Sequence, residues 1–240
     1  MIRYILRPVL AILLFATAQT ARTQKVVSEA NAQVRQVEAF TSISVGGALN
    51  VIITQGSQPT VVVAASDVKL RDKIFTRVED GTLHLGINGS HFNTNGRQWM
   101  RVYIAVPDLK KIGAGGASDV IIEGIFKAAN LEIALSGASD FRGHIEAERL
   151  KLAASGSSDI DIKGKTDKVE VALSGASDLN GRGLVARVCE IGASGSSDAQ
   201  ISVTEQIKAS ASGSCEIVYY GNPLDVKHAS TRGATIMQRN

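Results

Sequence analysis

Six copies of one short motif, spaced about twenty residues apart, limit the folds that are open to this chain. The letters LSGASD stand at 135–140 and again at 173–178, and the near-copies are AGGASD at 114–119, ASGSSD at 154–159 and 193–198, and ASGSCE at 211–216. The central glycines are 21, 19, 19, 20 and 18 residues apart. Such a period is typical of solenoids, in which each unit buries its apolar face only by stacking on its neighbours. The repeat therefore predicts a solenoid architecture, and does not by itself indicate a catalytic function.

Apolar and polar residues alternate around each central glycine, which we count as position zero. Position −4 is apolar or small in every copy: Ile112, Ile133, Leu152, Val171, Ile191 and Ala209. Position −5 is mostly charged, and position +3 is acidic throughout. A period of two predicts strands with one face in the core and one in solvent. We therefore expect an all-β fold, a β-solenoid with rungs of about 20 residues, each made of two or three short strands joined by Gly/Ser turns.

The first residues have the pattern of a secretory signal peptide. Arg3 and Arg7 precede an apolar run, and small residues follow, with cleavage expected after Ala18 or Ala21. The run is shorter than the ~20 apolar residues that span a membrane. We therefore expect 1–21 to be removed, and the exported chain to keep no transmembrane segment.

The remaining chain divides into four parts by composition. Residues 22–36 are polar and aperiodic and predict a flexible leader, whereas 37–106 have β character and bulkier side chains. Residues 107–222 are the Gly/Ser/Asp repeats, and 223–240 are expected to form a C-terminal cap or tail. We expect the register of the repeat to break after Gly213. Solenoid ends expose strand edges and need cover.

Two stretches within 37–106 connect this region to the repeats. GGALNVIITQG at 46–56 aligns with GGASDVIIEG at 115–124, which indicates a diverged rung. Asp80 and Gly81 lie between two strand-like runs, which is a strong hairpin signal. The region is therefore expected to be either a cap or a first, diverged segment of the solenoid.

The two cysteines stand at different positions of the repeat. Cys189 lies at −6, an apolar position, and Cys215 lies at +2, where the other copies have serine. These positions are about half a rung apart, whereas a disulfide needs Cα atoms within roughly 7 Å. We expect two buried free thiols, although export would permit a disulfide.

Charge and histidine content exclude some functions. The formal charge is +3, and removal of a signal with two arginines leaves 24 bases against 23 acids, close to neutral. Such a balance gives no reason to expect nucleic acid or an anionic membrane as a partner. The four histidines, His84, His91, His144 and His228, fit no metal-ligand spacing.

The chain resembles the family known as the putative auto-transporter adhesin head GIN domain, which is found in exported proteins of Gram-negative bacteria. The resemblance rests on FTSISVGGALNVIITQG at 40–56, VEDGTLHLGI at 78–87, VYIAVPDLKKIGAGGASDV at 102–120 and the SGASD repeats, and it covers about 37–222. It implies a right-handed β-helix and a place in the periplasm or on the outer cell surface. It supplies no catalytic residues.

The acidic residues at +3 are the candidate site. They would form a column that we call the acidic ladder: Asp119, Asp140, Asp159, Asp178, Asp198 and Glu216. Two like charges at ~4 Å repel by about 1 kcal/mol in water, so something must offset the repulsion. One interpretation is that each carboxylate accepts hydrogen bonds from backbone N–H groups and from the serine hydroxyls at −1 and +2. The other is that cations, with Ca²⁺ as the candidate, lie between the oxygens.

These patterns favour an exported, non-catalytic binding module of the cell envelope. Its Ser/Asp-lined face would contact a glycan, a matrix protein or another envelope protein, and homo-oligomers are compatible with flat solenoid faces. One alternative is a structural spacer without a specific ligand. Another is a polysaccharide-active enzyme, but a catalytic acid pair should be unique and set in two different environments, whereas this acid recurs in every rung.

Overall fold

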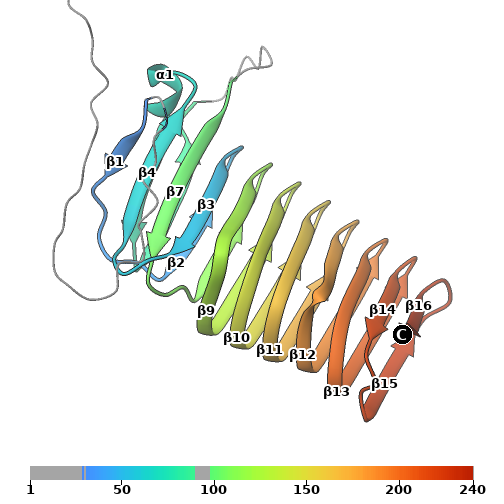
Figure 1. The fold of residues 1–240 in the computed structure, drawn as a ribbon. Coiled ribbons are helices and arrows are strands. Elements are labelled where there is room, and N and C mark those ends of the chain that lie inside the picture. The colour runs from blue at the N-terminus through green and yellow to red at the C-terminus, as the bar shows by residue number, and fades with distance from the viewer. Residues whose placement is uncertain (1–28, 30, 90–97, 240) are drawn as a thin grey trace, which may run out of the picture.

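The repeats form the rungs of a β-solenoid in the computed structural model, which describes residue 29, residues 31–89 and residues 98–239. The structure is 69% strand and 2% helix, with about 7 turns of about 19 residues each. Figure 1 shows the rungs stacked one behind another along a single axis. The all-β solenoid expected from the repeats is thereby confirmed. The expected signal peptide at 1–21 lies outside the described residues.

From β9 to β13 each rung is one long strand rather than two or three short ones, whereas β8, at the first repeat, has four residues. These strands are β8 (Lys111–Ala114), β9 (Asp119–Leu135), β10 (Asp140–Ala154), β11 (Asp159–Leu173), β12 (Asp178–Gly195) and β13 (Asp198–Gly213). They pair in parallel, so that Asp140 lies beside Asp159 and Leu152 beside Val171. Each strand from β9 to β13 begins after one glycine turn and ends at or before the next, and bends midway (Figure 1). The half of each strand that follows a glycine turn, such as 140–146 in β10, forms one face of the coil, which we call the post-turn face. The half that precedes the next turn, such as 149–154, forms the pre-turn face.

The N-terminal region continues both faces. Its elements are β1 (Gln33–Arg35), β2 (Ser42–Val45), β3 (Asn50–Gln55), β4 (Thr60–Ala65), α1 (Val68–Arg71), β5 (Ile74–Glu79), β6 (Thr82–Ile87) and β7 (Met100–Val106). β3 pairs in parallel with β9, with Asn50 beside Asp119. β6 and β7 pair in parallel with β2 and β3 and form one further rung. The diverged rung expected at 46–56 is therefore present.

Antiparallel strands end the coil on the N-terminal side. β4 pairs with β7, β1 pairs with β4, and β5 pairs with β6, all antiparallel. The β5–β6 hairpin turns at Asp80 and Gly81, whose φ angles of 47° and 68° suit a type I′ turn. The region is thus both a pair of diverged rungs and a cap.

The leader prediction for 22–36 is wrong at its C-terminal end. Gln33–Arg35 forms β1, with Val34 beside Val62 of β4. Two of its three residues are exposed, so the strand leaves no alternating pattern in the sequence, and its order comes from the edge of β4. Residues 22–28 and 30 lie outside the described part of the chain.

The register does not break after Gly213, contrary to expectation. β14 (Glu216–Tyr220) and β15 (Asp225–Ser230) pair in parallel with β13 and add one more rung. β16 (Thr235–Arg239) pairs in parallel with β14 and begins another. His228 occupies the inward position of Ala209, and Gln238 that of Tyr219. Polar residues at inward positions end the core here, and they also concealed the register in the sequence.

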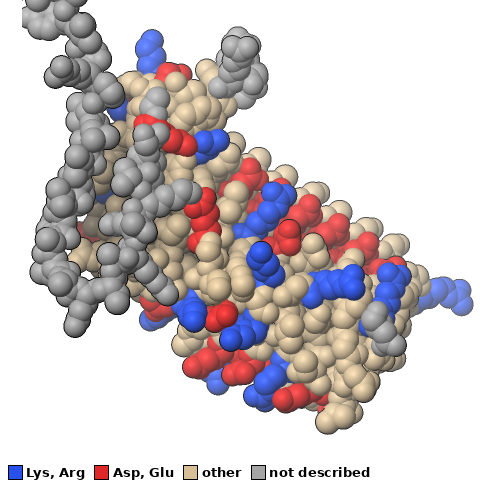
Figure 2. Space-filling view, viewed as in Figure 1, with Lys and Arg blue, Asp and Glu red and all other residues tan. Residues whose placement is uncertain are grey.

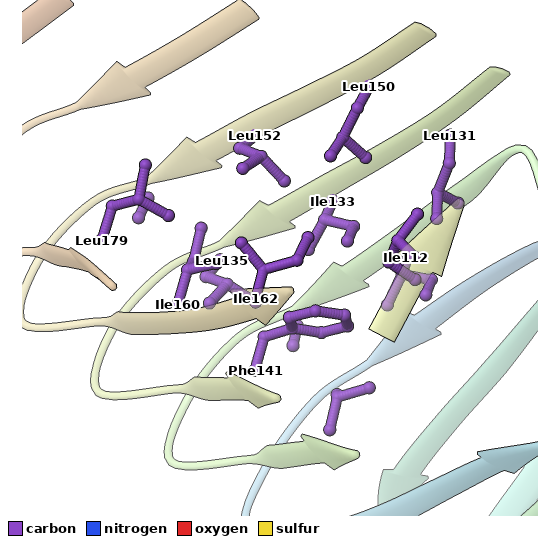
Figure 3. Packing of buried hydrophobic residues seen from close by; sticks show 14 of the residues in the cluster. Ile112, Leu131, Ile133, Leu135, Phe141, Leu150, Leu152, Ile160, Ile162 and Leu179 are labelled. Carbon is purple, nitrogen blue, oxygen red and sulfur yellow. The ribbon is translucent and has the colours of Figure 1, made fainter. Parts of the chain in front are cut away.

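The core is a set of apolar columns that run along the coil axis. Leu150 stacks on Leu131 and Leu152 on Ile133, and all four are at most 2% exposed (Figure 3). Cys189 and Cys215 are buried free thiols, as expected. Burial raises the pKa of the Cys189 thiol to about 12, which makes it unreactive at neutral pH.

Among the described residues, helix is confined to one short segment. α1 has four residues, and none of the helices in the described residues is long and apolar enough to cross a membrane.

Candidate functional site

The glycine turn determines what surrounds the candidate site. Gly156 has a φ of +83°, and a Cβ there would lie 2.4 Å from the carbonyl oxygen of Gly137 in the preceding rung. The same contact recurs at the other central glycines of the repeats. Only glycine permits both this φ and this close approach of successive turns. The repeated glycine is therefore structural.

The serines at position +2 point into the molecule. Ser118, Ser139, Ser158, Ser177 and Ser197 are all 0% exposed. Ser158 Oγ donates to the carbonyl oxygen of Ser155 at 3.1 Å and accepts from the backbone N–H of Ser139 at 3.3 Å. Each buried hydroxyl is thus satisfied by hydrogen bonds, and these bonds link adjacent turns.

The serines at position −1 bond to the preceding rung as well. Ser155 Oγ donates to the carbonyl oxygen of Leu135 at 3.3 Å, and Ser194 Oγ to that of Leu173 at 3.3 Å. The expected bonds from these hydroxyls to the acidic ladder are therefore wrong for both serine positions. The reason is that each hydroxyl has a backbone carbonyl of the turns within hydrogen-bonding distance, 3.3 Å for Ser155 and 3.1 Å for Ser158.

The acidic ladder itself is assembled as predicted. The register places Asp140 beside Asp119 and Asp159, and it continues to Glu216. Figure 2 shows the acidic side chains following one another along the edge of the post-turn face, next to the turns. Asn50 extends this column at one end and Thr235 at the other, with no carboxylate. The alignment of 46–56 with 115–124 already placed Asn50 at the position of Asp119.

Backbone N–H groups satisfy part of the ladder. The N–H of Asp198 donates to Asp178 Oδ1 at 3.1 Å, and that of Glu216 donates to Asp198 Oδ1 at 2.9 Å. Each carboxylate in these pairs thus accepts a bond from the next acidic residue of the column. This agrees with the backbone part of the first interpretation.

The carboxylates still repel one another. Burial, and then the charge of neighbouring ladder residues, raise the pKa of Asp119 and of Asp159 above its ordinary value. Arg142, which lies in the next outward column, partly offsets both shifts. Two ladder acids with pKa shifts in the same direction and from the same causes do not resemble a differentiated acid–base pair.

A metal site does not emerge from the described residues. Within 29, 31–89 and 98–239, no three His, Cys, Asp or Glu side chains lie in an arrangement that could hold an ion. His84, His144 and His228 lie on three different strands, and His91 is outside the described ranges. Ca²⁺ binding by the ladder remains an untested prediction.

A shallow groove lies across the turn from the ladder, on the pre-turn face. It has a volume of about 470 Å³. Its lining is almost entirely small side chains, and we call it the serine groove: Leu135, Ala153, Ala154, Ser155, Ala172, Leu173, Ser174, Gly192, Ala193, Ser194, Ser210 and Ser212. Sequence analysis predicted a Ser/Asp-lined face but not this groove, whose signal is the run of Ala and Gly at position −3.

Paired charges border the groove at position −5. Lys111 Nζ lies 2.9 Å from Glu132, and Lys208 Nζ lies 2.6 Å from Glu190. These contacts lower the pKa of both glutamates, chiefly through the hydrogen bond from the lysine. Opposite charges one strand apart thus leave this border nearly neutral.

One polar cluster on the post-turn face had no signal in the sequence. Glu29 accepts from Arg101 at 2.7 Å and from the Tyr103 hydroxyl, although these residues are 72 and 74 positions away. The Arg101 guanidinium also lies 4.9 Å from the Trp99 ring centroid. Partners so distant in the chain become neighbours only through the fold.

Comparison with solved structures supports the fold. The chain is similar to a putative adhesin from Bacteroides fragilis (TM-score 0.79, 23% identity, 87% of this chain and 96% of that chain). It is also similar to a putative adhesin from Parabacteroides merdae (0.68, 18%, 87% and 95%) and to a putative lipid binding protein from Parabacteroides distasonis (0.64, 19%, 86% and 96%). At these identities the similarity shows the fold alone.

Comparison of sequences identifies the family. No curated protein matches the chain. The family described as "Putative auto-transporter adhesin, head GIN domain" matches residues 39–223, which include β2 to β14 and thus nearly all of the solenoid. The chain therefore belongs to the family of putative auto-transporter adhesin head GIN domains.

Proposed function

We propose that this protein is an exported, non-catalytic binding module of the cell envelope, and that the serine groove is its contact surface. The observation that carries the proposal is the regular repetition of that groove. Alanine, glycine and serine residues recur at ~4.8 Å from rung to rung, so an extended ligand lying along the coil axis meets the same groups repeatedly.

The chemistry of the groove suits an extended, hydroxyl-rich polymer. Its floor offers methyl groups and serine hydroxyls, and its charged border is paired. Small side chains allow close approach of a flat ligand and lose little rotamer entropy on binding. These properties favour a glycan, with a matrix or envelope protein as the next candidate. The family name and the adhesin neighbours support an adhesive role.

The direct test of the contact surface places two large side chains in the serine groove. Ala172→Arg with Ser210→Arg should abolish binding to the glycan found in an array of bacterial and host polysaccharides, or weaken it at least tenfold. Leu224→Arg is the matched control, because Leu224 is 93% exposed and lies outside the groove. Binding that survives the double substitution would move the contact surface elsewhere. An array without any bound glycan or matrix protein would favour the spacer alternative.

Location and catalysis have separate tests. Protease added to intact cells should digest a module on the outer surface but spare a periplasmic one until the outer membrane is opened. Digestion in intact cells supports direct adhesion, and protection excludes it.

Release of sugar products that is lost on Asp140→Asn would establish catalysis and contradict the non-catalytic proposal.

A further inference from the structure

The C-terminal end of the coil is uneven, because its post-turn face extends one strand further than its pre-turn face. β13 carries β14 on its post-turn half and β15 on its pre-turn half. β16 then lies on β14, whereas no described strand lies on β15. Figure 1 shows these three strands together at this end. They form what we call the terminal step, with β15 as its floor and the inward face of β16 as its wall.

Both strands of the terminal step have an open edge. Among the residues that the structure describes, β15 pairs with β13 alone and β16 with β14 alone. An open edge presents a row of N–H and C=O groups with which a further strand can pair. The core is open here as well, since Val226 is 39% exposed and Ile236 is only partly buried. A strand added to β15 would therefore gain a backbone ladder and an apolar contact.

A second copy of the chain has the shape that fits this step. A two-fold axis parallel to the strands, placed between the two sheets, turns the post-turn face of one chain over the pre-turn face of the other. β16 of each chain then lies antiparallel on β15 of its partner, and the two β16 strands together make one complete rung. Such a contact is isologous, so it closes with two chains and leaves no open edge between them.

The side chains of the two strands suit each other in this arrangement. β16 runs away from its glycine turn to Arg239, and β15 begins far from the turn at Asp225, so the partner's Arg239 approaches this acid. His228 and the partner's Gln238 both hold inward positions of the shared rung. Gln238 Nε2 donates to the carbonyl oxygen of Gly221 at 2.8 Å, and its Oε1 can accept from an imidazole N–H. An apolar strand of another protein would offer His228 no such acceptor, which favours a second copy.

The N-terminal end of the coil is less suited to pairing. β1 has three residues, and β5 carries an ion pair between Arg77 and Glu79 at 2.7 Å. Short and charged edge strands discourage the addition of a further strand. Stacking of one chain's C-terminal end on the next chain's N-terminal end would also continue without closing. The C-terminal ends are therefore the pair that can meet.

We infer that two copies of this chain associate through the terminal step, each placing β16 on β15 of its partner. Strands of five and six residues and sheets about 10 Å apart give a contact of roughly 400 Å² per chain, which is small enough for association to depend on concentration. The two serine grooves then face in opposite directions. The inference does not depend on what the groove binds.

Sedimentation of the full chain tests the association. The wild type should change from monomer to dimer over a hundredfold range of concentration. Val226→Lys places a charge inside the shared rung and should weaken the association at least tenfold. Val185→Lys is the matched control, because Val185 is 46% exposed and lies on β12, away from the terminal step. A monomer at every concentration, or an equal effect of the two variants, would overturn the inference.

Disulfide trapping tests the arrangement of the two chains. Lys227→Cys with Arg239→Cys should give at least tenfold more disulfide-linked dimer than either single variant, because the two-fold axis brings 227 near 239 of the partner. Within one chain the two positions lie on opposite faces of the coil. The native thiols are buried and should not compete. No gain over the single variants, or efficient linkage through Met237→Cys alone, would contradict the shared rung.

Discussion

The repeat region and the N-terminal region build the same two faces, but their turns differ. In the repeats, the backbone at each central glycine touches the backbone of the preceding one, with no room for a Cβ. At Gly81 and Gly89 a Cβ would meet nothing within 4 Å. The comparison explains why the repeats keep one motif while the N-terminal rungs vary: each repeat turn is constrained by the turn before it.

The largest expected effect is a direct test of this difference. Gly156→Ala should lower the free energy of unfolding by about 3 to 5 kcal/mol, because the new Cβ adds overpacking to the cost of a positive φ. Gly81→Ala, at φ +68° with open space around it, should cost about 1 kcal/mol. Urea unfolding measures both. Equal losses would mean that φ alone, and not turn stacking, requires glycine.

The loss of stability on truncating a core side chain should depend on the position of its rung along the coil. Leu152→Ala, in a middle rung, should cost about 3 kcal/mol, because it leaves a cavity between two neighbouring rungs. Ile236→Ala, in the last rung, should cost about 1 kcal/mol, since its side chain is only partly buried. Thermal and urea unfolding would compare them. A smaller loss at Leu152 would show that the rungs collapse onto cavities easily.

The buried and exposed serines of one turn offer a finer comparison. Ser158→Ala should cost about 2 kcal/mol, because it removes the acceptor of the buried Ser139 N–H. Ser157→Ala, at an exposed position in the same turn, should stay within about 0.5 kcal/mol of the parent. Cys215→Ser should be tolerated, since serine is the residue of that column. An unstable Cys215→Ser variant would contradict the role given to the column.

Acids on the two sides of the turn should have opposite pH dependence. The pKa of Asp159 is raised in the folded state, so its charge costs stability at pH 7 and that cost disappears below its ordinary pKa of about 3.9. Asp159→Asn should therefore stabilise the protein by about 0.3 kcal/mol at pH 7, after solvent screening, and should be neutral at pH 3.

Glu132 should show the reverse. Its pKa is lowered, chiefly by the hydrogen bond from Lys111, so its stabilising effect is present above its ordinary pKa of about 4.3 and is lost as the pH falls. Glu132→Gln should destabilise at pH 7, and the loss should shrink as the pH falls through the lowered pKa of the folded state. Unfolding curves across this pH range would decide, and parallel behaviour of the two variants would contradict the assignment.

The smallest expected effect concerns cations. The melting temperature should be the same in EDTA and in millimolar Ca²⁺, because backbone N–H groups already bond to the ladder at Asp178 and Asp198. A rise of several degrees with Ca²⁺ that is lost in Asp140→Asn would instead establish cation binding.

The repeat predicted the fold because period-two alternation and a fixed rung length are local properties of the sequence. Position +2 has the same parity as the buried position −4, so its serines face inward, and their hydroxyls bond to carbonyls of the turn and not, as expected, to the acidic ladder. The polar residues of the last rung concealed a register that pairing preserves, with Val226 beside Ile207. The Glu29–Arg101 pair could not be predicted, because neither residue belongs to a motif and the contact depends on the cap.

The stacked glycine turns also restrict how a protein of this kind can change its length during evolution. A single inserted residue in a turn would displace a backbone contact that has no spare space, whereas a duplicated rung would present the same turn to its neighbours. Homologues should therefore differ in extent by whole rungs, and the span of the serine groove should grow or shrink with them.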